Sequence, residues 1–234
     1  MSVTENIARV REQIAVAAQR ARRSPDAVTL MAVSKTFPVE DIQEAYLAGT
    51  RVFGENRVQE FAGKFSAVRD LPEVRFHLIG HLQSNKAGKG AELFHAIDSI
   101  DSLKLAEKLN SAALTLGKKL SVLLEVNVGG EAAKSGMSPD SAEIVAILEA
   151  APRLTNLEIR GLMTVPPFTE NPERARPYFR QLRELRDRLA QRNFPAITLA
   201  ELSMGMSHDF AVAIEEGSTC VRVGTAIFGE RTKA

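Results

Sequence analysis

Two kinds of apolar pattern alternate along the chain. Short runs rich in β-branched residues are separated by longer segments in which apolar side chains recur every three or four positions. The first pattern is typical of strands buried on both faces, and the second is typical of helices with one apolar side. The predicted strands are residues 28–34, 51–54, 75–80, 95–100, 120–128, 158–165, 197–203 and 219–228.

Helical periodicity accounts for most of the intervening chain. Ser2 and Glu5 have the spacing of a capping box, which predicts a helix at the amino terminus. The arginines of this segment are typical of a transit peptide. However, Glu5 and Glu12 lie among them, and transit peptides are poor in acids, so we favour a helix of the mature protein. The predicted helices are residues 2–22, 39–48, 58–68, 102–116, 138–151 and 173–192, with a further helix that begins at Asp209.

The alternation of strands and helices predicts an α/β fold with a parallel sheet. Eight strands in 234 residues fit a single (β/α)8 TIM barrel, which usually takes about 250 residues. Too few residues follow the last strand for a full eighth helix, so we expect the amino-terminal helix to complete the outer ring. A doubly wound open sheet is the alternative, but no G-x-G-x-x-G follows a predicted strand. We therefore expect one barrel domain over residues 1–234.

Charge and cysteine content narrow the class of protein. The formal net charge is +1, so no broad basic field is present to bind nucleic acid or an acidic membrane. Cys220 is the only cysteine, which excludes an intramolecular disulfide and a site with several thiolate ligands. No apolar run approaches the roughly 18 residues that span a bilayer. We expect a cytoplasmic protein with no nucleic-acid or membrane partner.

Candidate chemistry gathers at predicted strand ends, where barrels of this kind carry their functional residues. Lys35 closes the first strand, where it can form a Schiff base or simply be a solvated lysine that ends a strand. Near the ends of the last two strands, small residues supply the N–H groups and hydroxyls of a phosphate cradle: Ser203, Gly205, Ser207, Gly224 and Thr225. A lysine and a phosphate cradle together suggest pyridoxal 5′-phosphate (PLP), the cofactor form of vitamin B6.

One histidine lies within the third predicted strand and another directly follows it. His77 and His81 are four residues apart, which suits a metal pair only on a helix, and Gly80 between them argues against a helix. No third ligand is evident, so we expect no metal. His77 is then a flat side chain beside a planar ligand or a hydrogen-bonded histidine at the rim.

Eight segments match the pattern of a known family. They are residues 31–36 (MAVSKT), 53–56 (FGEN), 77–86 (HLIGHLQSNK), 125–128 (EVNV), 134–137 (KSGM), 160–164 (RGLMT), 202–207 (LSMGMS) and 221–229 (VRVGTAIFG). Over nearly the whole chain, the sequence resembles the YggS/PROSC family of pyridoxal phosphate homeostasis proteins. The resemblance implies a fold-type III PLP-binding barrel, similar to the barrel domain of alanine racemase but without that enzyme's second domain.

The resemblance also implies which residues hold the cofactor. Lys35 would carry PLP as a covalent imine, and Arg222 would face the pyridine nitrogen. His208 departs from the family, which more often has an acid after the serine. The other implied contacts are Ser203, Gly224 and Thr225 at the phosphate, Asn56 and His77 along the ring, and Met204 and Ser207 closing the pocket.

The pairing of PLP with Arg222 bears on activity. A guanidinium beside the pyridine nitrogen disfavours ring protonation, and the protonated ring is the strong electron sink of many PLP enzymes. We therefore expect a monomeric, non-catalytic protein that buffers PLP and delivers it to apoenzymes. A PLP-dependent amino-acid racemase is the alternative. A barrel aldolase or isomerase acting on a sugar phosphate is a third hypothesis, but Arg222 has no evident role in that chemistry.

Overall fold

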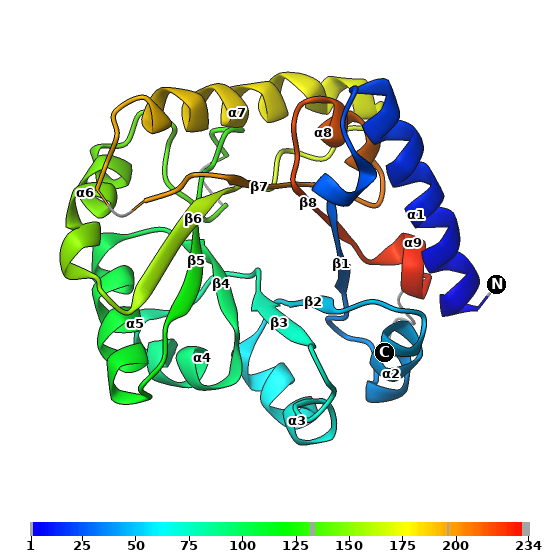
Figure 1. Ribbon diagram of the computed structural model, residues 1–234, viewed down its shortest axis with the longest axis horizontal. Coiled ribbons are helices and arrows are strands. Elements are labelled where there is room, and N and C mark those ends of the chain that lie inside the picture. The colour runs from blue at the N-terminus through cyan, green and yellow to red at the C-terminus, as the bar shows by residue number, and fades with distance from the viewer. Residues whose placement is uncertain (1, 132–133, 196, 231–234) are drawn as a thin grey trace.

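The strands form one closed barrel (Figure 1). The computed structural model describes residues 2–131, 134–195 and 197–230. The strands are β1 (Thr29–Val33), β2 (Val52–Glu55), β3 (Arg75–Leu78), β4 (Ala96–Ile100), β5 (Leu120–Glu125), β6 (Leu157–Met163), β7 (Glu201–Met206) and β8 (Cys220–Val223). Each strand pairs in parallel with the next, and β1 pairs with β8. This closure confirms the predicted (β/α)8 barrel and excludes the open sheet.

Helices surround the barrel (Figure 1). They are α1 (Val3–Arg20), α2 (Val39–Leu47), α3 (Val58–Val68), α4 (Ala87–Leu93), α5 (Leu103–Thr115), α6 (Ala142–Ala150), α7 (Arg176–Ala190), α8 (Phe210–Glu215) and α9 (Thr225–Phe228). Single 3₁₀ turns lie at Pro25–Ala27, Ser84–Lys86, Ala151–Arg153 and Pro172–Ala175. Within the described part of the chain, no helix is long and apolar enough to cross a membrane.

The amino-terminal helix belongs to the outer ring. The Ser2 hydroxyl accepts the Glu5 N–H (3.2 Å) and the Glu5 carboxylate accepts the Ser2 N–H (2.8 Å), which is the predicted capping box. α1 then packs against α8, α9 and α2, with Ile7, Val10 and Ile14 buried (Figure 1). It covers the gap that the four-residue helix α9 leaves after β8, as expected from the sequence.

The main apolar core lies between the strands and the helices. Phe53 of β2 and Phe76 of β3 stack at 5.5 Å between ring centroids, and Phe61 of α3 lies 4.6 Å from Phe76. All three rings are fully buried, and burial of one phenylalanine contributes about 1.5–3 kcal/mol. Neighbouring residues on a strand face opposite sides of the sheet. His77 follows Phe76 and therefore faces the interior of the barrel.

The barrel interior is unusually polar for this fold, whose interior is mostly filled by branched apolar side chains. Asp98 of β4, Ser203 of β7 and Arg222 of β8 are all buried there. Close apolar packing inside the barrel occurs at Gly54 of β2. A Cβ at Gly54 would come within 2.8 Å of the Met31 sulfur, so a larger residue would not fit without displacement of Met31. Buried polar groups need partners, and these partners define the candidate site.

The last two strands differ from their predicted bounds. The seventh was predicted over residues 197–203, but β7 covers Glu201–Met206, and the eighth ends at Val223 where α9 follows. Short apolar runs such as Ala226-Ile227-Phe228 do not distinguish a strand from a buried helix turn. Helix α4 was not predicted, because its glycines disfavour a helix. Gly90 leaves room for Leu82, since a Cβ there would lie 3.2 Å from the end of the Leu82 side chain, which would then have to shift.

Candidate functional site

Lys35 lies two residues beyond β1, at the carboxyl end of the barrel, and is half-buried. The preceding Ser34 hydroxyl donates to a carboxylate oxygen of buried Glu55 (2.9 Å). The Lys64 ammonium, on α3, donates to the Ser34 carbonyl (3.1 Å) and to the same Glu55 oxygen (3.2 Å). Hydrogen bonds that involve charged groups are roughly twice as strong as neutral ones. The backbone that carries Lys35 is therefore held firmly.

The residue after Lys35 has a strained backbone. Thr36 has a φ of +67°, a left-handed conformation that β-branched residues rarely adopt. Its N–H donates to the Glu60 carboxylate (2.5 Å), which also pairs with Lys64 (3.1 Å). Such strain persists only where the surroundings hold it, and it is often found at functional sites.

The two glutamates beneath Lys35 have opposite shifts in pKa. Burial raises the pKa of Glu55, and the Lys64 ammonium and the Ser34 hydroxyl offset only part of this effect. Burial acts in the same direction on Glu60, but the Thr36 N–H and Lys64 outweigh it and lower the pKa of Glu60. Glu60 is therefore ionised near neutral pH and keeps its hold on Lys64 and on the strained turn.

Arg222 is 3% exposed and donates two short hydrogen bonds inside the barrel. Its guanidinium donates to the Ser203 hydroxyl (2.7 Å) and to the Thr164 carbonyl (2.6 Å). Burial lowers the pKa of Arg222, while nearby acids, among them Asp98 and Asp209, act to raise it. An arginine remains protonated in proteins even after such a shift. A fixed positive charge therefore lies beneath the carboxyl end of the barrel.

The turns after β7 and β8 meet at Ser207. Its hydroxyl oxygen accepts the N–H groups of Gly224 (3.2 Å) and Ala226 (3.3 Å), so the hydroxyl proton remains available as a donor. Thr225 lies between these two residues and is exposed at the start of α9. Gly205 has a φ of +94°, and a Cβ there would overlap Ala213. The structure thus brings Ser207, Gly224 and Thr225 of the predicted phosphate cradle together, whereas Ser203 is fully buried and bonded to Arg222.

Asp209 supplies the acid of this turn, one position after His208. The exposed His208 ring turns away, and its Nε2 lies 2.9 Å from the Glu170 carbonyl. The buried Asp209 carboxylate accepts the Met206 N–H (2.6 Å). Burial raises the pKa of Asp209, and this hydrogen bond and Arg222 act against the rise. The His208 ring therefore lies outside the interior of the turn, and Asp209 is the acid inside it.

Asn56 follows β2 and is half-buried at the same end of the barrel. Its carbonyl packs against Gly80, where a Cβ would overlap it, so a glycine is required at the end of the third strand. Met204 is fully buried in the apolar layer between the strands and the helices. Only the backbone of Met204 is suited to contact a ligand at the mouth.

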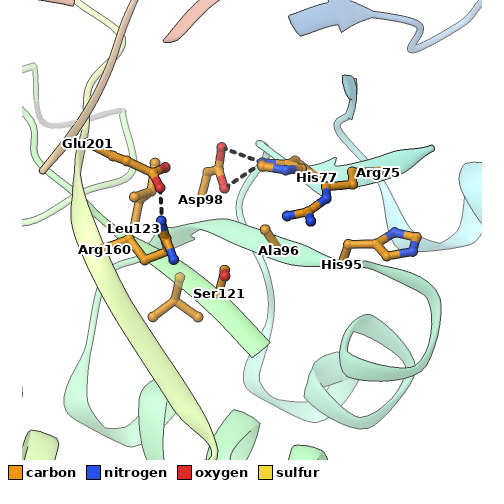
Figure 2. A pocket seen from close by; sticks show the side chains of 10 residues that line it. Arg75, His77, His95, Ala96, Asp98, Ser121, Leu123, Arg160 and Glu201 are labelled. Carbon is orange, nitrogen blue, oxygen red and sulfur yellow. Dashed lines mark hydrogen bonds and ion pairs between the residues drawn. The ribbon is translucent and has the colours of Figure 1, made fainter. Parts of the chain in front are cut away.

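His77 lies deeper than the other candidate residues. Its Nδ1 is 3.1 Å from the Asp98 carboxylate, as Figure 2 shows. Burial acts to lower the pKa of His77, but Asp98 outweighs it and the pKa is raised. The cavity that His77 lines includes Arg75 and Glu201, the first residues of β3 and β7. The structure thus groups His77 with the amino-terminal end of the barrel and not with Lys35.

The two histidines of the third strand do not converge on one point. His77 pairs with Asp98, and His81 pairs separately with Asp101 (3.1 Å). Among the residues described, no three histidine, cysteine, aspartate or glutamate side chains gather as metal ligands. Cys220 is buried in β8, where burial raises the pKa of its thiol to about 12, so it is not a reactive thiolate.

Glu125 was not predicted as a site residue. It ends β5, it is 8% exposed, and its Oε2 has no hydrogen-bond partner in the described structure. Burial and the Asp101 charge raise the pKa of Glu125 to about 7, and Arg222 partly opposes them. The sequence signal was a glutamate that closes an apolar strand. Asp98, inside the apolar run of β4, carries a similar signal.

Replacement of Glu125 with glutamine will flatten the pH dependence of stability. A raised pKa means that the folded chain binds a proton that the unfolded chain releases above about pH 4.5. Glu125 therefore makes stability fall as pH rises from about 4.5 to about 7, by about 2–3 kcal/mol in total. Urea unfolding across this range will measure the slope in E125Q and in exposed E92Q as the control. An unchanged slope in E125Q would contradict the shift.

The sequence matches a family model and curated proteins over nearly its whole length. The family model of the alanine racemase N-terminal domain matches residues 6–232. A pyridoxal phosphate homeostasis protein of Aquifex aeolicus is 48% identical over 231 residues, which cover 99% of each chain. Another, from Pseudomonas aeruginosa, is 46% identical over 230 residues, which cover 98% of this chain and 96% of that one.

Two solved structures resemble this chain to different degrees. PipY of Synechococcus elongatus, solved with PLP bound, superposes with a TM-score of 0.85 at 41% identity and covers 97% of this chain and 100% of its own. An alanine racemase of Clostridium difficile has a TM-score of 0.74 at 15% identity, over 99% of this chain and 57% of the racemase chain. The second likeness shows the barrel fold alone.

Proposed function

The chain belongs to the family of pyridoxal phosphate homeostasis proteins, and we propose that it binds PLP and releases it to apoenzymes. One structural observation carries the proposal. The carboxyl end of the barrel combines a half-buried lysine on a fixed, strained turn with a separate turn of hydroxyls and N–H groups. An amine for an aldehyde and a cradle for a phosphate are the two features that PLP needs in a protein.

The residues at this end of the barrel fit the cofactor. Lys35 would hold the aldehyde, while Ser207, Gly224 and Thr225 would hold the phosphate. When bound, PLP supplies an aldehyde carbon that a neutral amine attacks. The partnerless Oε2 of Glu125 adds a buried acid whose raised pKa lets it give or take a proton near neutral pH.

The remaining candidate residues support the site in different ways. Asn56 and the Met204 backbone belong to the same end of the barrel as Lys35. Ser203 already accepts a hydrogen bond from Arg222, which orients the guanidinium. We propose that His77 influences the site indirectly, from deeper in the barrel. His77 pairs with Asp98, and the Asp98 charge in turn acts on Arg222.

Arg222 favours a binding protein over a racemase. Its charge is fixed, so it disfavours a proton on the pyridine nitrogen and leaves PLP a weak electron sink. The chain matches 57% of the racemase chain with which it shares a fold, but 99% of the homeostasis protein of Aquifex aeolicus. We therefore propose a carrier without catalytic turnover. The single buried cysteine suits the reducing cytoplasm.

Two measurements on one preparation test this function. Titration with PLP will give a yellow protein with a saturable imine absorbance at one equivalent. The loaded protein, held in heavy water with alanine, will exchange the α-proton no faster than free PLP does, as followed by NMR. Absence of a saturable band would contradict PLP binding. Fast α-proton exchange would contradict the carrier and favour the racemase.

Substitution of Thr225 with valine will weaken PLP binding by about 1–3 kcal/mol, because a hydroxyl donor to a charged phosphate is lost without change of shape. Affinity for unphosphorylated pyridoxal will change much less. Fluorescence or absorbance titrations with both ligands measure the difference. The T169V variant is the control, because Thr169 is half-buried outside the cradle and donates to the Asn171 carbonyl. Equal losses for PLP and pyridoxal would show that Thr225 does not contact the phosphate.

A further inference from the structure

A second polar cavity lies at the end of the barrel opposite Lys35 (Figure 2). It has a volume of about 120 Å³ and is lined from several strands. Arg75, Ala96 and Glu201 are the first residues of β3, β4 and β7, so the cavity opens at the amino-terminal end of the parallel strands. Its position separates it from the PLP site proposed above.

Most charges around this cavity are matched in pairs. Arg160 pairs with Glu201 through its Nε (2.6 Å), and His77 pairs with Asp98 (3.1 Å), as Figure 2 shows. Arg75 is the exception. Its guanidinium turns toward His77 and Ala96 (Figure 2), and it makes no hydrogen bond or ion pair with the part of the chain that the structure describes.

A second donor is also without a partner. The Ser121 hydroxyl lines the cavity, is half-buried, and makes no hydrogen bond within the described residues. A guanidinium offers a planar fork of N–H donors that matches a carboxylate, and a hydroxyl can donate to the same oxygens. The unmatched positive charge of Arg75 therefore faces the cavity beside a donor that can share its ligand.

We propose that this cavity binds a small monocarboxylate, with its carboxylate on the Arg75 guanidinium and the Ser121 hydroxyl. The number of charges selects a monoanion, because Arg75 is the one cation of the lining without a partner in the described structure. The carboxylates of Glu201 and Asp98, which also line the cavity, repel a dianion such as phosphate more strongly than a monoanion.

The size of the cavity limits the ligand. An engineered protein cavity of about 150 Å³ holds one benzene molecule of six carbon atoms. A volume of about 120 Å³ therefore suits a ligand of about four to six non-hydrogen atoms, such as acetate or propionate. Long-chain acids and bulky cofactors are excluded.

Sodium acetate is the probe, added at constant ionic strength to the full-length chain after saturation with PLP, so that the other end of the barrel is occupied. Histidine side-chain NMR reports on the cavity, because His77 and His95 line it. Variants with glutamine at His81, His95 and His208 assign the signals, with His77 by elimination. Acetate is expected to shift the His77 signal along a saturating curve.

Three variants separate a built site from a general salt effect. Arg75→Gln is expected to weaken acetate binding about tenfold or more, and Ser121→Ala about threefold. Arg69→Gln removes an exposed arginine that pairs with Asp70, and this variant is expected to bind acetate like the parent chain. Both cavity variants change side chains that are not fully buried, and a thermal unfolding scan verifies that each is folded.

Several outcomes would overturn the inference. A shift that never saturates, or one that persists unchanged in both Arg75→Gln and Ser121→Ala, would show that no carboxylate site exists. An equal response to acetamide would show that charge is not recognised. Tighter binding of inorganic phosphate than of acetate would refute the monocarboxylate class. None of these results bears on PLP binding by Lys35, so the two proposals fail separately.

Discussion

Replacement of Lys35 with alanine will abolish the covalent attachment of PLP. The lysine emerges from a turn held by Ser34, Glu55 and Lys64, so its amine is presented at the carboxyl end of the barrel from a rigid base. An alanine removes the nucleophile and leaves that base intact. The phosphate cradle is also untouched, so the variant is expected to keep weak, reversible affinity for PLP.

Borohydride reduction followed by intact-mass measurement tests this result. The parent chain is expected to gain one reduced adduct, and Lys35→Ala none. Lys89→Ala is a matched control, because Lys89 is exposed and pairs with Glu92 on the surface. A full-stoichiometry adduct on Lys35→Ala would refute the assignment. A smaller residual adduct would point to a second lysine, with Lys86 and Lys134 as candidates near strand ends.

Replacement of Arg222 with methionine will lower the free energy of unfolding by about 3–5 kcal/mol, because loss of a buried cation leaves nearby buried acids without their counter-charge. Arg222 also donates to Ser203 and Thr164, and both acceptors would lose a charged donor. Methionine retains much of the apolar stem of arginine, so the loss will report on charge and hydrogen bonding more than on packing.

The loss in Arg222→Met will grow with pH. Arg222 holds down the raised pKa values of Asp209 and Glu125, so without the guanidinium these folded-state pKa values rise further and the folded chain binds more protons than the unfolded chain. Stability then falls as pH increases. Urea unfolding of the PLP-free protein at pH 5.5 and 8 measures the difference.

Arg183→Met is the control for this pair of measurements. Arg183 is partly exposed and pairs with Glu216, which keeps Arg176 and Arg180 as partners after the change. Its loss is expected to be below about 1 kcal/mol at both values of pH. A loss in Arg222→Met that is as small as in Arg183→Met, or one that shrinks as pH rises, would contradict the buried-charge role of Arg222.

Local pattern predicted the barrel because each of its elements carries its own periodic signal. Helix α3 occupies the predicted residues, and the capping box of α1 is present as predicted. The predicted bounds of helices and strands were wrong where local sequence signals conflict. The apolar run after Val223 was predicted to be strand, and the glycines of α4 weakened the helical signal of a segment in which Gly90 lies close to Leu82.

The mouth of the barrel was predictable from position along the chain. Lys35, Asn56 and Ser207 each follow a strand, and the closing of parallel strands into a barrel brings all their carboxyl ends together. Strand order therefore sufficed to group residues that are far apart in sequence, including Lys35 and Gly224.

The sequence alone thus determined the fold, the single lysine at the end of the first strand and the turn near Ser207, because these depend on local periodicity and on strand order. Only the tertiary structure decided which side chains share the interior. His77 and Met204 lie near predicted strand ends, yet one enters a cavity with Arg75 and the other packs against helices. The physical reason is that strand register and barrel closure determine how deep each side chain lies in the barrel and which side of the sheet it faces. They also determine how far a side chain is removed from water, and this desolvation raises the pKa of Glu125.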